Sequence, residues 1–117
     1  MKTNQPSKYI GQKAEQEALN FLVDKNYSLL ERNYRYKRSE IDLIMTNQKT
    51  LVFVEVKFRS NNKFGHPEEF VSDNQKQSII KGAEHYIDSI TWEGNIRFDI
   101  VAVNAHFKIE HFEDAFY

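Results

Sequence analysis

Apolar positions spaced three to four residues apart predict two amphipathic helices in this chain. Residues 10–25 carry Ala14, Ala18 and Leu22 on one face, and Asn26 suits the left-handed conformation that ends a helix. Glu15 lies at the edge of this apolar stripe and not on the outer face of the helix. Residues 73–90 carry a second apolar face, formed by Ile79, Ile80, Ala83, Ile87 and Ile90. Each helix therefore has one side that can pack on a sheet.

Alternation of apolar and polar positions predicts the strands. They are expected at residues 28–34, 40–45, 51–59 and 96–103, with a short edge strand in "HFKIEHF" (106–112). "TNQK" (46–49) is expected to join the second and third as a hairpin. The order α-β-β-β-α-β-(β) predicts an α/β fold, in which helices flank a mixed sheet of four to five strands. The length of the chain predicts a single domain over residues 1–117, and residues 1–8 are expected to form a flexible tail.

The strand "LVFVEVKFR" has two unlike faces. Valines fill one face at 52, 54 and 56, whereas Phe53, Glu55 and Lys57 share the other. On local evidence, a Glu-x-Lys pair on a strand can also be two residues on a solvated sheet face. The apolar ring of Phe53 on the same face makes a partner-binding scaffold a weaker interpretation.

The predicted hairpin places further acidic groups near Glu55. In "SEIDLIM", Ile41, Leu43 and Met45 are expected on one face, and Asp42 on the other, within reach of Glu55. Glu15 could approach from the first helix. Converging carboxylates resist joint ionisation, and a hard cation such as Mg²⁺ removes that cost. Asp42 pairing with Arg38, and Glu15 pairing within its own helix, are the structural alternatives.

Composition and charge narrow the function classes. The chain has no cysteine, which excludes disulfides and thiolate sites, and the polar start "MKTNQPSK" together with the lack of a long apolar run predicts a cytoplasmic, non-membrane protein. The net charge is −1, but residues 31–63 carry +4 and residues 64–117 carry −6. "RNYRYKR" (32–38) interleaves Arg and Tyr, which suits nucleic-acid binding or, equally, a strand end with solvated cations.

The order of these motifs resembles one known family. "GQKAEQEALNFLVDKNYSLLERNYR", "SEIDLI", "LVFVEVKFRS", "FGHPEEFV", "IRFDIVAV" and "IEHFEDAF" are similar to the YraN-like family of bacterial proteins. That family belongs to the PD-(D/E)xK nuclease superfamily and is related to Holliday-junction resolvase-like endonucleases. The resemblance implies a restriction-endonuclease-like core.

The resemblance also implies roles for individual residues. Asp42 and Glu55 would be metal ligands for Mg²⁺ or Mn²⁺, Lys57 the catalytic lysine, and Glu15 the carboxylate added by resolvase-like members. Candidates for contacts with the nucleic acid are Arg32, Arg35, Arg59 and Lys76. Two positions depart from the family pattern. Ser39 replaces a glycine, with a strain cost if positive φ is needed there, and Gln75 replaces a lysine, next to Lys76.

These observations lead to two hypotheses of different classes. The first is a metal-dependent endonuclease that acts on DNA, in particular branched or structured DNA, with a homodimer implied by the resolvases. The second is a non-catalytic nucleic-acid-binding module that retains the nuclease fold and binds with a steep salt dependence.

Overall fold

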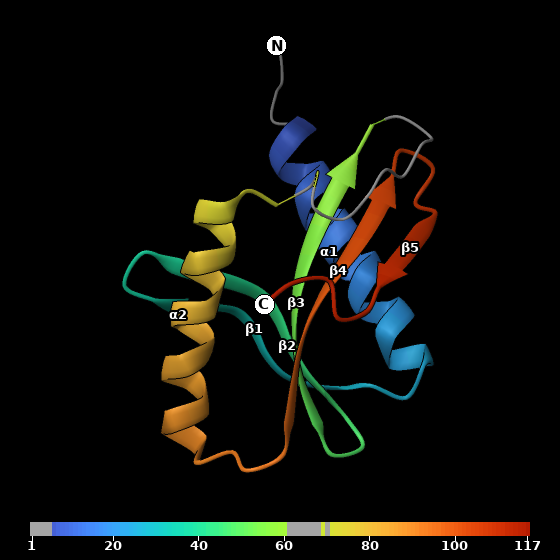
Figure 1. Ribbon diagram of the computed structural model, residues 1–117. Coiled ribbons are helices and arrows are strands. Elements are labelled where there is room, and N and C mark those ends of the chain that lie inside the picture. Colours follow the sequence, from blue (N-terminus) through green and yellow to red (C-terminus); the bar gives the residue numbers. More distant parts are fainter. Residues whose placement is uncertain (1–5, 61–68, 70) are drawn as a thin grey trace.

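The computed structural model describes residues 6–60, 69 and 71–117, and this part of the chain follows the predicted order of elements (Figure 1). The elements are α1 (Pro6–Asp24), β1 (Ser28–Tyr36), β2 (Ser39–Asn47), β3 (Thr50–Arg59), α2 (Asp73–Ile90), β4 (Asn95–Asn104) and β5 (Ile109–Phe112). The strands form one sheet in the order β1-β2-β3-β4-β5. Only the β3–β4 pair is parallel among these neighbours. A mixed α/β fold is thereby confirmed.

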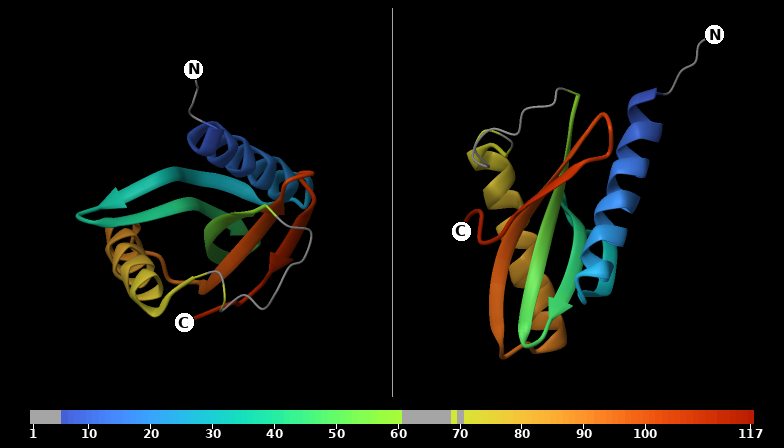
Figure 2. Two further views of the ribbon diagram at one scale, coloured as in Figure 1. Left: turned by 90° about the horizontal axis from the view of Figure 1, so that it is seen from above. Right: turned by 90° about the vertical axis from the view of Figure 1, so that its right-hand side faces the viewer.

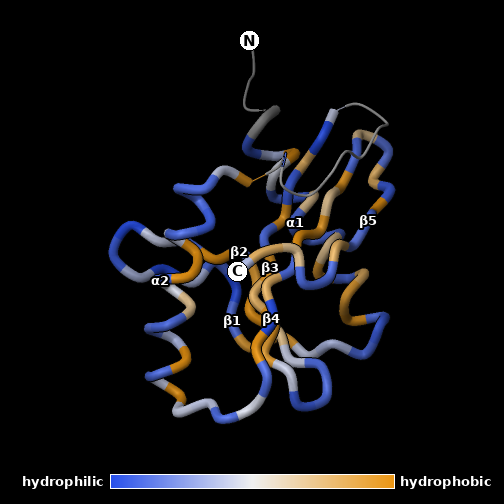
Figure 3. The backbone as a smooth tube through the Cα atoms, viewed as in Figure 1, coloured by the Kyte–Doolittle hydropathy of each residue, from blue (hydrophilic) through white to orange (hydrophobic). Residues whose placement is uncertain are grey.

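The two helices cover opposite faces of the sheet (Figure 2). The face under α2 buries Phe53, Phe98 and Ile100 against Ile79 and Tyr86 of the helix. The face under α1 buries a second cluster, which includes Leu22, Leu43, Val52, Val54 and Val101. Apolar positions are concentrated in the central strands, as Figure 3 shows. The valine face of β3 therefore packs against α1, and the face with Phe53, Glu55 and Lys57 is turned toward α2. Neither helix of the described part is long and apolar enough to cross a membrane.

The element boundaries differ from the predicted ones mainly at the start of the chain. α1 begins at Pro6, four residues before the predicted start, and so includes the last three residues of the predicted tail. The β2–β3 turn is confirmed and consists of Gln48 and Lys49, with Gln48 at φ 57°. Most of the predicted loop 60–70, with Gly65 and Pro67, lies outside the described residues.

One prediction about β2 is wrong. Ile41 packs with the α2 cluster, whereas Leu43 and Met45 pack with the α1 cluster, so the three do not share a face. The β2–β3 pairing extends only to Leu43, opposite Val54, and Asn33 on the neighbouring strand has φ 55°. A left-handed residue bends a strand locally. The regular alternation is therefore interrupted at Asp42.

Ser39 carries none of the strain that its place in the family pattern suggested. It is not among the described residues with positive φ. Its side chain is buried and accepts a hydrogen bond from the Ser78 hydroxyl at 3.2 Å. Gly82 of α2 packs directly on it, because a Cβ atom at Gly82 would lie 3.1 Å from the Ser39 Cβ. Ser39 therefore lies at a point of close packing between α2 and β2.

Candidate active site

The β2–β3 hairpin brings Asp42 and Glu55 together. Asn47 pairs with Thr50 and Leu43 with Val54, so 42 and 55 are the next positions facing each other. Here a side chain takes the place of the backbone hydrogen bonds between the two strands. Asp42 Oδ2 accepts a hydrogen bond of 2.7 Å from the Val56 N–H. Because a strand N–H points within the sheet, the Asp42 carboxylate lies where β2 and β3 separate. The predicted approach of Asp42 to Glu55 agrees with this register.

Glu55 and Lys57 meet α2 through the amide of Gln75. The Gln75 Nε2 donates to Glu55 Oε2 at 2.7 Å, and the Lys57 Nζ donates to Gln75 Oε1 at 3.2 Å. Lys57 Nζ also lies 3.3 Å from Glu55 Oε2. Gln75 is itself fixed by the start of α2, where its backbone N–H donates to the Ser72 hydroxyl. The three side chains form a closed polar triangle at the first turn of the helix.

Burial raises the pKa of both carboxyl groups, of Asp42 to about 6 and of Glu55 to about 8. The hydrogen bond from the Val56 N–H lowers the pKa of Asp42, and the negative charges of Glu15 and Glu40 raise it further. The negative charge of Asp42 raises the pKa of Glu55 further, whereas the ammonium of Lys57 lowers it. At neutral pH the pair therefore retains a proton unless a cation replaces it.

Glu15 reaches the site from the α1 side. Its Oε1 accepts hydrogen bonds from Arg32 Nε at 3.0 Å and from Asn33 Nδ2 at 3.1 Å. Glu15, Asn33 and Asp42 line one open hollow of about 430 Å³, together with Glu40 and part of α1. Glu15 is thus near Asp42, with an arginine and an amide already bound to it.

The donor set suits a hard divalent cation. Half-buried Asp42 and buried Glu55 supply carboxylate oxygens from two strands, and Mg²⁺ is usually bound by one or two carboxylates, with water and phosphate completing the shell. Over residues 6–60, 69 and 71–117, no group of three or more His, Asp or Glu side chains is arranged to hold a metal. The residues that fit the cation are therefore this pair, with Glu15 beside it.

The basic residues implied by the family resemblance lie in different settings. Arg32 is bound to Glu15 and to Gln16 Oε1, and Arg35 pairs loosely with Glu40 at 3.5 Å. Arg59 contacts the Phe58 carbonyl, and Lys76 lies 3.9 Å from Asp73. Gln75, in contrast, is the α2 residue that touches both Glu55 and Lys57. The sequence pointed to Gln75 in one way, because the family pattern usually has a lysine at this position.

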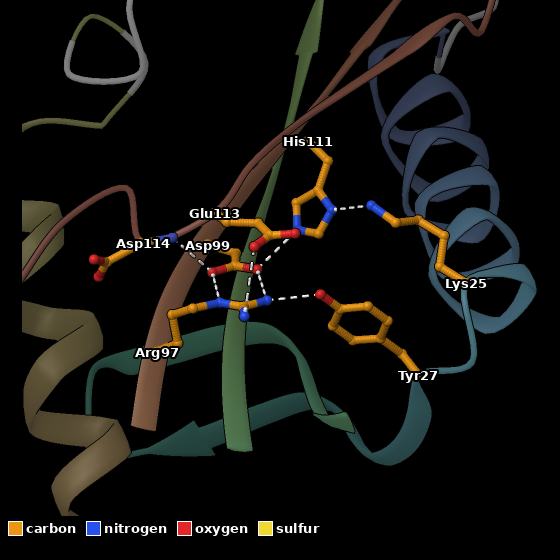
Figure 4. A network of polar contacts seen from close by, with 7 residues as sticks. All are labelled: Lys25, Tyr27, Arg97, Asp99, His111, Glu113 and Asp114. Carbon is orange, nitrogen blue, oxygen red and sulfur yellow. Dashed lines mark hydrogen bonds and ion pairs between the residues drawn. The ribbon is translucent and has the colours of Figure 1, made fainter. Parts of the chain in front are cut away.

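A second polar network lies under α1 and was missed by sequence reasoning (Figure 4). Asp99 of β4 is fully buried and accepts hydrogen bonds from Arg97 at 2.9 and 2.8 Å and from the backbone N–H of Asp114 at 3.0 Å. His111 Nε2 lies 2.7 Å from Asp99 Oδ2, and Lys25 Nζ lies 2.9 Å from His111 Nδ1. Because an ammonium only donates, His111 Nδ1 accepts from Lys25, and the Nε2–H of His111 donates a hydrogen bond to Asp99 Oδ2.

This network satisfies a buried charge and ties distant segments together. Burial raises the Asp99 pKa, but the hydrogen bonds from His111, Arg97 and the Asp114 backbone outweigh it, so the pKa is lowered overall. Arg97 also donates to the Tyr27 hydroxyl at 2.6 Å. The available signal was a lone aspartate inside the apolar run "IRFDIVAV". A buried aspartate requires partners.

Fold and site define a small α/β protein with a mixed five-stranded sheet and a carboxylate–lysine site where a β-hairpin meets the helix of a parallel crossover. The chain belongs to the UPF0102 (YraN-like) family, because the model described as "Uncharacterised protein family UPF0102" matches residues 14–103.

Curated relatives agree with this assignment over most of their length. The chain is 44% identical to a UPF0102 protein of Flavobacterium psychrophilum and 41% identical to one of Christiangramia forsetii. Each match covers 92% of this chain and 93% of the relative. A UPF0102 protein of Chlorobium phaeobacteroides is 40% identical over the same shares.

Proposed function

We propose that this protein is a metal-dependent endonuclease that hydrolyses phosphodiester bonds in DNA, with branched or structured DNA as its substrate class. The observation that supports the proposal is the meeting of two carboxyl groups, half-buried Asp42 and buried Glu55, beside the ammonium of Lys57. Burying two like charges is costly, and their raised pKa values express that cost. Perturbed carboxyl groups of this kind are concentrated at functional sites.

Asp42 and Glu55 would hold Mg²⁺ or Mn²⁺, with Glu15 next to them. When bound, such a cation activates water and neutralises charge on the phosphate. Lys57 is held by Glu55 and Gln75 at the edge of the site and has 22% of its side chain exposed. It can therefore donate hydrogen bonds to a phosphate oxygen or to the attacking water.

The choice of DNA and of branched substrates rests on the resemblance to resolvase-like endonucleases. It is tested with four-way junctions, plain duplexes and single strands, each with Mg²⁺ or Mn²⁺. Asp42→Asn and Lys57→Met should each reduce the cleavage rate by about 100-fold or more, because each removes a group that acts on the reacting phosphate. Lys49→Ala, in the distant β2–β3 turn, is the matched control, and circular dichroism verifies folding. Cleavage that persists in both site variants would contradict the proposal.

Calorimetric titration with Mn²⁺ tests the metal site without a substrate. Wild-type protein should bind Mn²⁺ and release a proton to the buffer, because the cation displaces the proton that the pair retains at neutral pH, and Glu55→Gln should weaken this binding. Salt-dependent DNA binding that needs no metal and produces no cleavage would instead identify a binding module. The resolvase resemblance also implies a homodimer, which sedimentation equilibrium measures directly.

A further inference from the structure

A second cavity lies beside the candidate active site, between the β1–β2 turn and one side of α2. Its volume is about 530 Å³, within the range of small-molecule sites. Lys37 and Arg38 of the turn form one wall, and Asn74, Gln77, Ser78 and Lys81 of α2 form the other. Tyr36 and Ser39 lie at the ends of the two strands and complete the lining. We call this cavity the basic pocket.

The basic pocket concentrates positive charge on a protein whose net charge is −1. Lys37, Arg38 and Lys81 line it, all three exposed to solvent, and the lining that the structure describes includes no carboxylate. Glu84 and Asp88 line a neighbouring hollow further along α2, away from the first turn of the helix. Lys37 and Lys81 line that hollow too, so the basic pocket is the part of this groove where the cations have no carboxylate beside them in the described lining.

The pocket lies on the α2 face of the sheet, the face that also carries Glu55 and Lys57. Ser39 and Ser78 are hydrogen-bonded at the pocket, and Gln75 of the active site lies one helical turn before Ser78. Along β2, Ser39 precedes Asp42 by three residues, which is about 10 Å of strand. That distance equals the axial rise of about three base pairs of duplex DNA. A single polynucleotide can thus reach both places.

An ordered aromatic wall adds a second feature that suits nucleic acid. The Tyr36 ring is stacked on His85 with centroids 3.8 Å apart and 14° between the planes. His85 is in turn fixed by a 2.8 Å hydrogen bond between its Nδ1 and the Tyr34 hydroxyl. The ring that lines the pocket is therefore held in place before a ligand arrives, which lowers the entropic cost of binding. Aromatic side chains beside cations are typical of surfaces that bind unpaired bases.

We propose that the basic pocket binds a nucleotide of the DNA strand within about three positions of the scissile phosphate. Its phosphate would contact Lys37, Arg38 and Lys81, and its base or sugar would lie against Tyr36 and the amides of Asn74 and Gln77. This inference rests on the proposed function for the position of the scissile phosphate. The pocket adds what the Asp42–Glu55 pair lacks, a positive surface that orients the strand across the site.

The test measures binding without cleavage, with a short fluorescein-labelled DNA strand in EDTA. Lys81→Ala and Arg38→Ala should each weaken binding several-fold and lower the slope of log affinity against log salt by about 0.7 per lost phosphate contact. Lys49→Ala and Lys108→Ala remove exposed lysines in turns away from the pocket and should leave both quantities unchanged. In the NMR spectrum, the backbone amide signals of Ser39, Gln77 and Ser78 should shift on titration.

Three results would overturn the inference: control variants that weaken binding as much as the pocket variants, signal shifts confined to other parts of the chain, or equal shifts with polyglutamate, which would indicate an acidic protein partner. Cleavage assays of the same variants distinguish a failure of this inference from a failure of the proposed function. If cleavage depends on Lys57 but Lys81→Ala cuts as well as Lys49→Ala, the pocket inference alone fails. If the pocket variants lose binding while wild-type protein cuts nothing, the pocket inference holds and the proposed function fails.

Discussion

Gln75 binds two charged side chains through the two ends of one amide. Its Nε2 donates to Glu55 and its Oε1 accepts from Lys57, so it orients both groups at once. Gln75→Ala would leave Lys57 without one of its partners and Glu55 without its donor from α2. With Glu55 in its proposed role as a metal ligand, we expect kcat for DNA cleavage to fall about 10- to 100-fold, the usual effect of removing a partner of such a carboxylate.

A lysine at the same position provides the comparison for this prediction. Gln75→Lys keeps a donor for Glu55 and adds a positive charge, which lowers the pKa of that carboxyl group. The variant should therefore retain more activity than Gln75→Ala, and its pH profile should move toward lower pH. Wild-type kcat in Gln75→Ala would show that Gln75 has no positioning role.

The raised pKa values of Asp42 and Glu55 make stability depend on pH. The folded protein binds protons more tightly than the unfolded chain, whose carboxyl groups titrate near pH 4. The stabilising contribution is therefore complete at low pH and is lost as pH rises through about 6 and about 8. Without divalent cations, the free energy of unfolding should decrease between pH 5 and pH 8.

Glu55→Gln isolates the contribution of this carboxyl group from the other titratable groups of the protein. The variant cannot ionise at this position, so its free energy of unfolding should change much less between pH 5 and pH 8 in urea titrations. Glu110→Gln replaces an exposed carboxylate of β5 and should behave like wild-type protein. Equal pH slopes for wild type and Glu55→Gln would contradict the assigned pKa shift.

At the scale of elements, the approach of α2 to β2 depends on a pair of small residues. A Cβ at Gly82 would lie 3.1 Å from Ser39 Cβ and 3.4 Å from Ile41 Cδ1. Gly82→Ala should therefore destabilise the protein by about 1–3 kcal/mol through overpacking, although alanine favours a helix by about 1 kcal/mol. In the Ser39→Gly background the same change should be neutral or stabilising. Urea denaturation of the four proteins measures this coupling, and additive effects would contradict it.

The secondary structure was predictable because its signals are local. Strict alternation in β3 and the helical spacing of Ile79 and Ala83 each depend on only a few neighbouring residues. The approach of Asp42 to Glu55 followed as well, since a short turn fixes the register of a hairpin. These parts of the site needed no knowledge of distant contacts.

Features that depend on tertiary contacts were not predictable in the same way. The bend at Asp42 moves Ile41 to the α2 face, and it coincides with the left-handed Asn33 on another strand. The role of Gln75 requires knowing that the first turn of α2 lies over β3. Asp99 looked like an exception in an apolar strand, and besides Arg97 of the same strand its partners are His111 of β5 and the backbone N–H of Asp114. In each case the deciding contact joins residues far apart in the sequence.

At the scale of the whole molecule, the Asp99 network holds the last strand and the C-terminal segment on the sheet. Asp99 is 0% exposed and His111 has 4% of its side chain exposed, so removing the charge leaves buried donors without an acceptor. Asp99→Asn should lower the free energy of unfolding by about 3 kcal/mol. Glu113→Gln, whose carboxylate is half exposed and 3.6 Å from Arg97, should cost less than about 1 kcal/mol. Equal losses in the two variants would show that burial of Asp99 is not what matters.

The two polar sites should together give the protein an acidic stability optimum. Asp99 has a lowered pKa, so its contribution is present above the unfolded value near pH 4 and is lost as pH falls below it. Asp42 and Glu55 act in the opposite direction, because their contribution is lost as pH rises toward 8. The free energy of unfolding without divalent cations should therefore be largest between about pH 4 and pH 6. Glu55→Gln should flatten the upper side of this curve and Asp99→Asn the lower side. Urea titrations across this range test both, and an optimum that neither variant changes would refute the assignment of the two sites as opposing titrations.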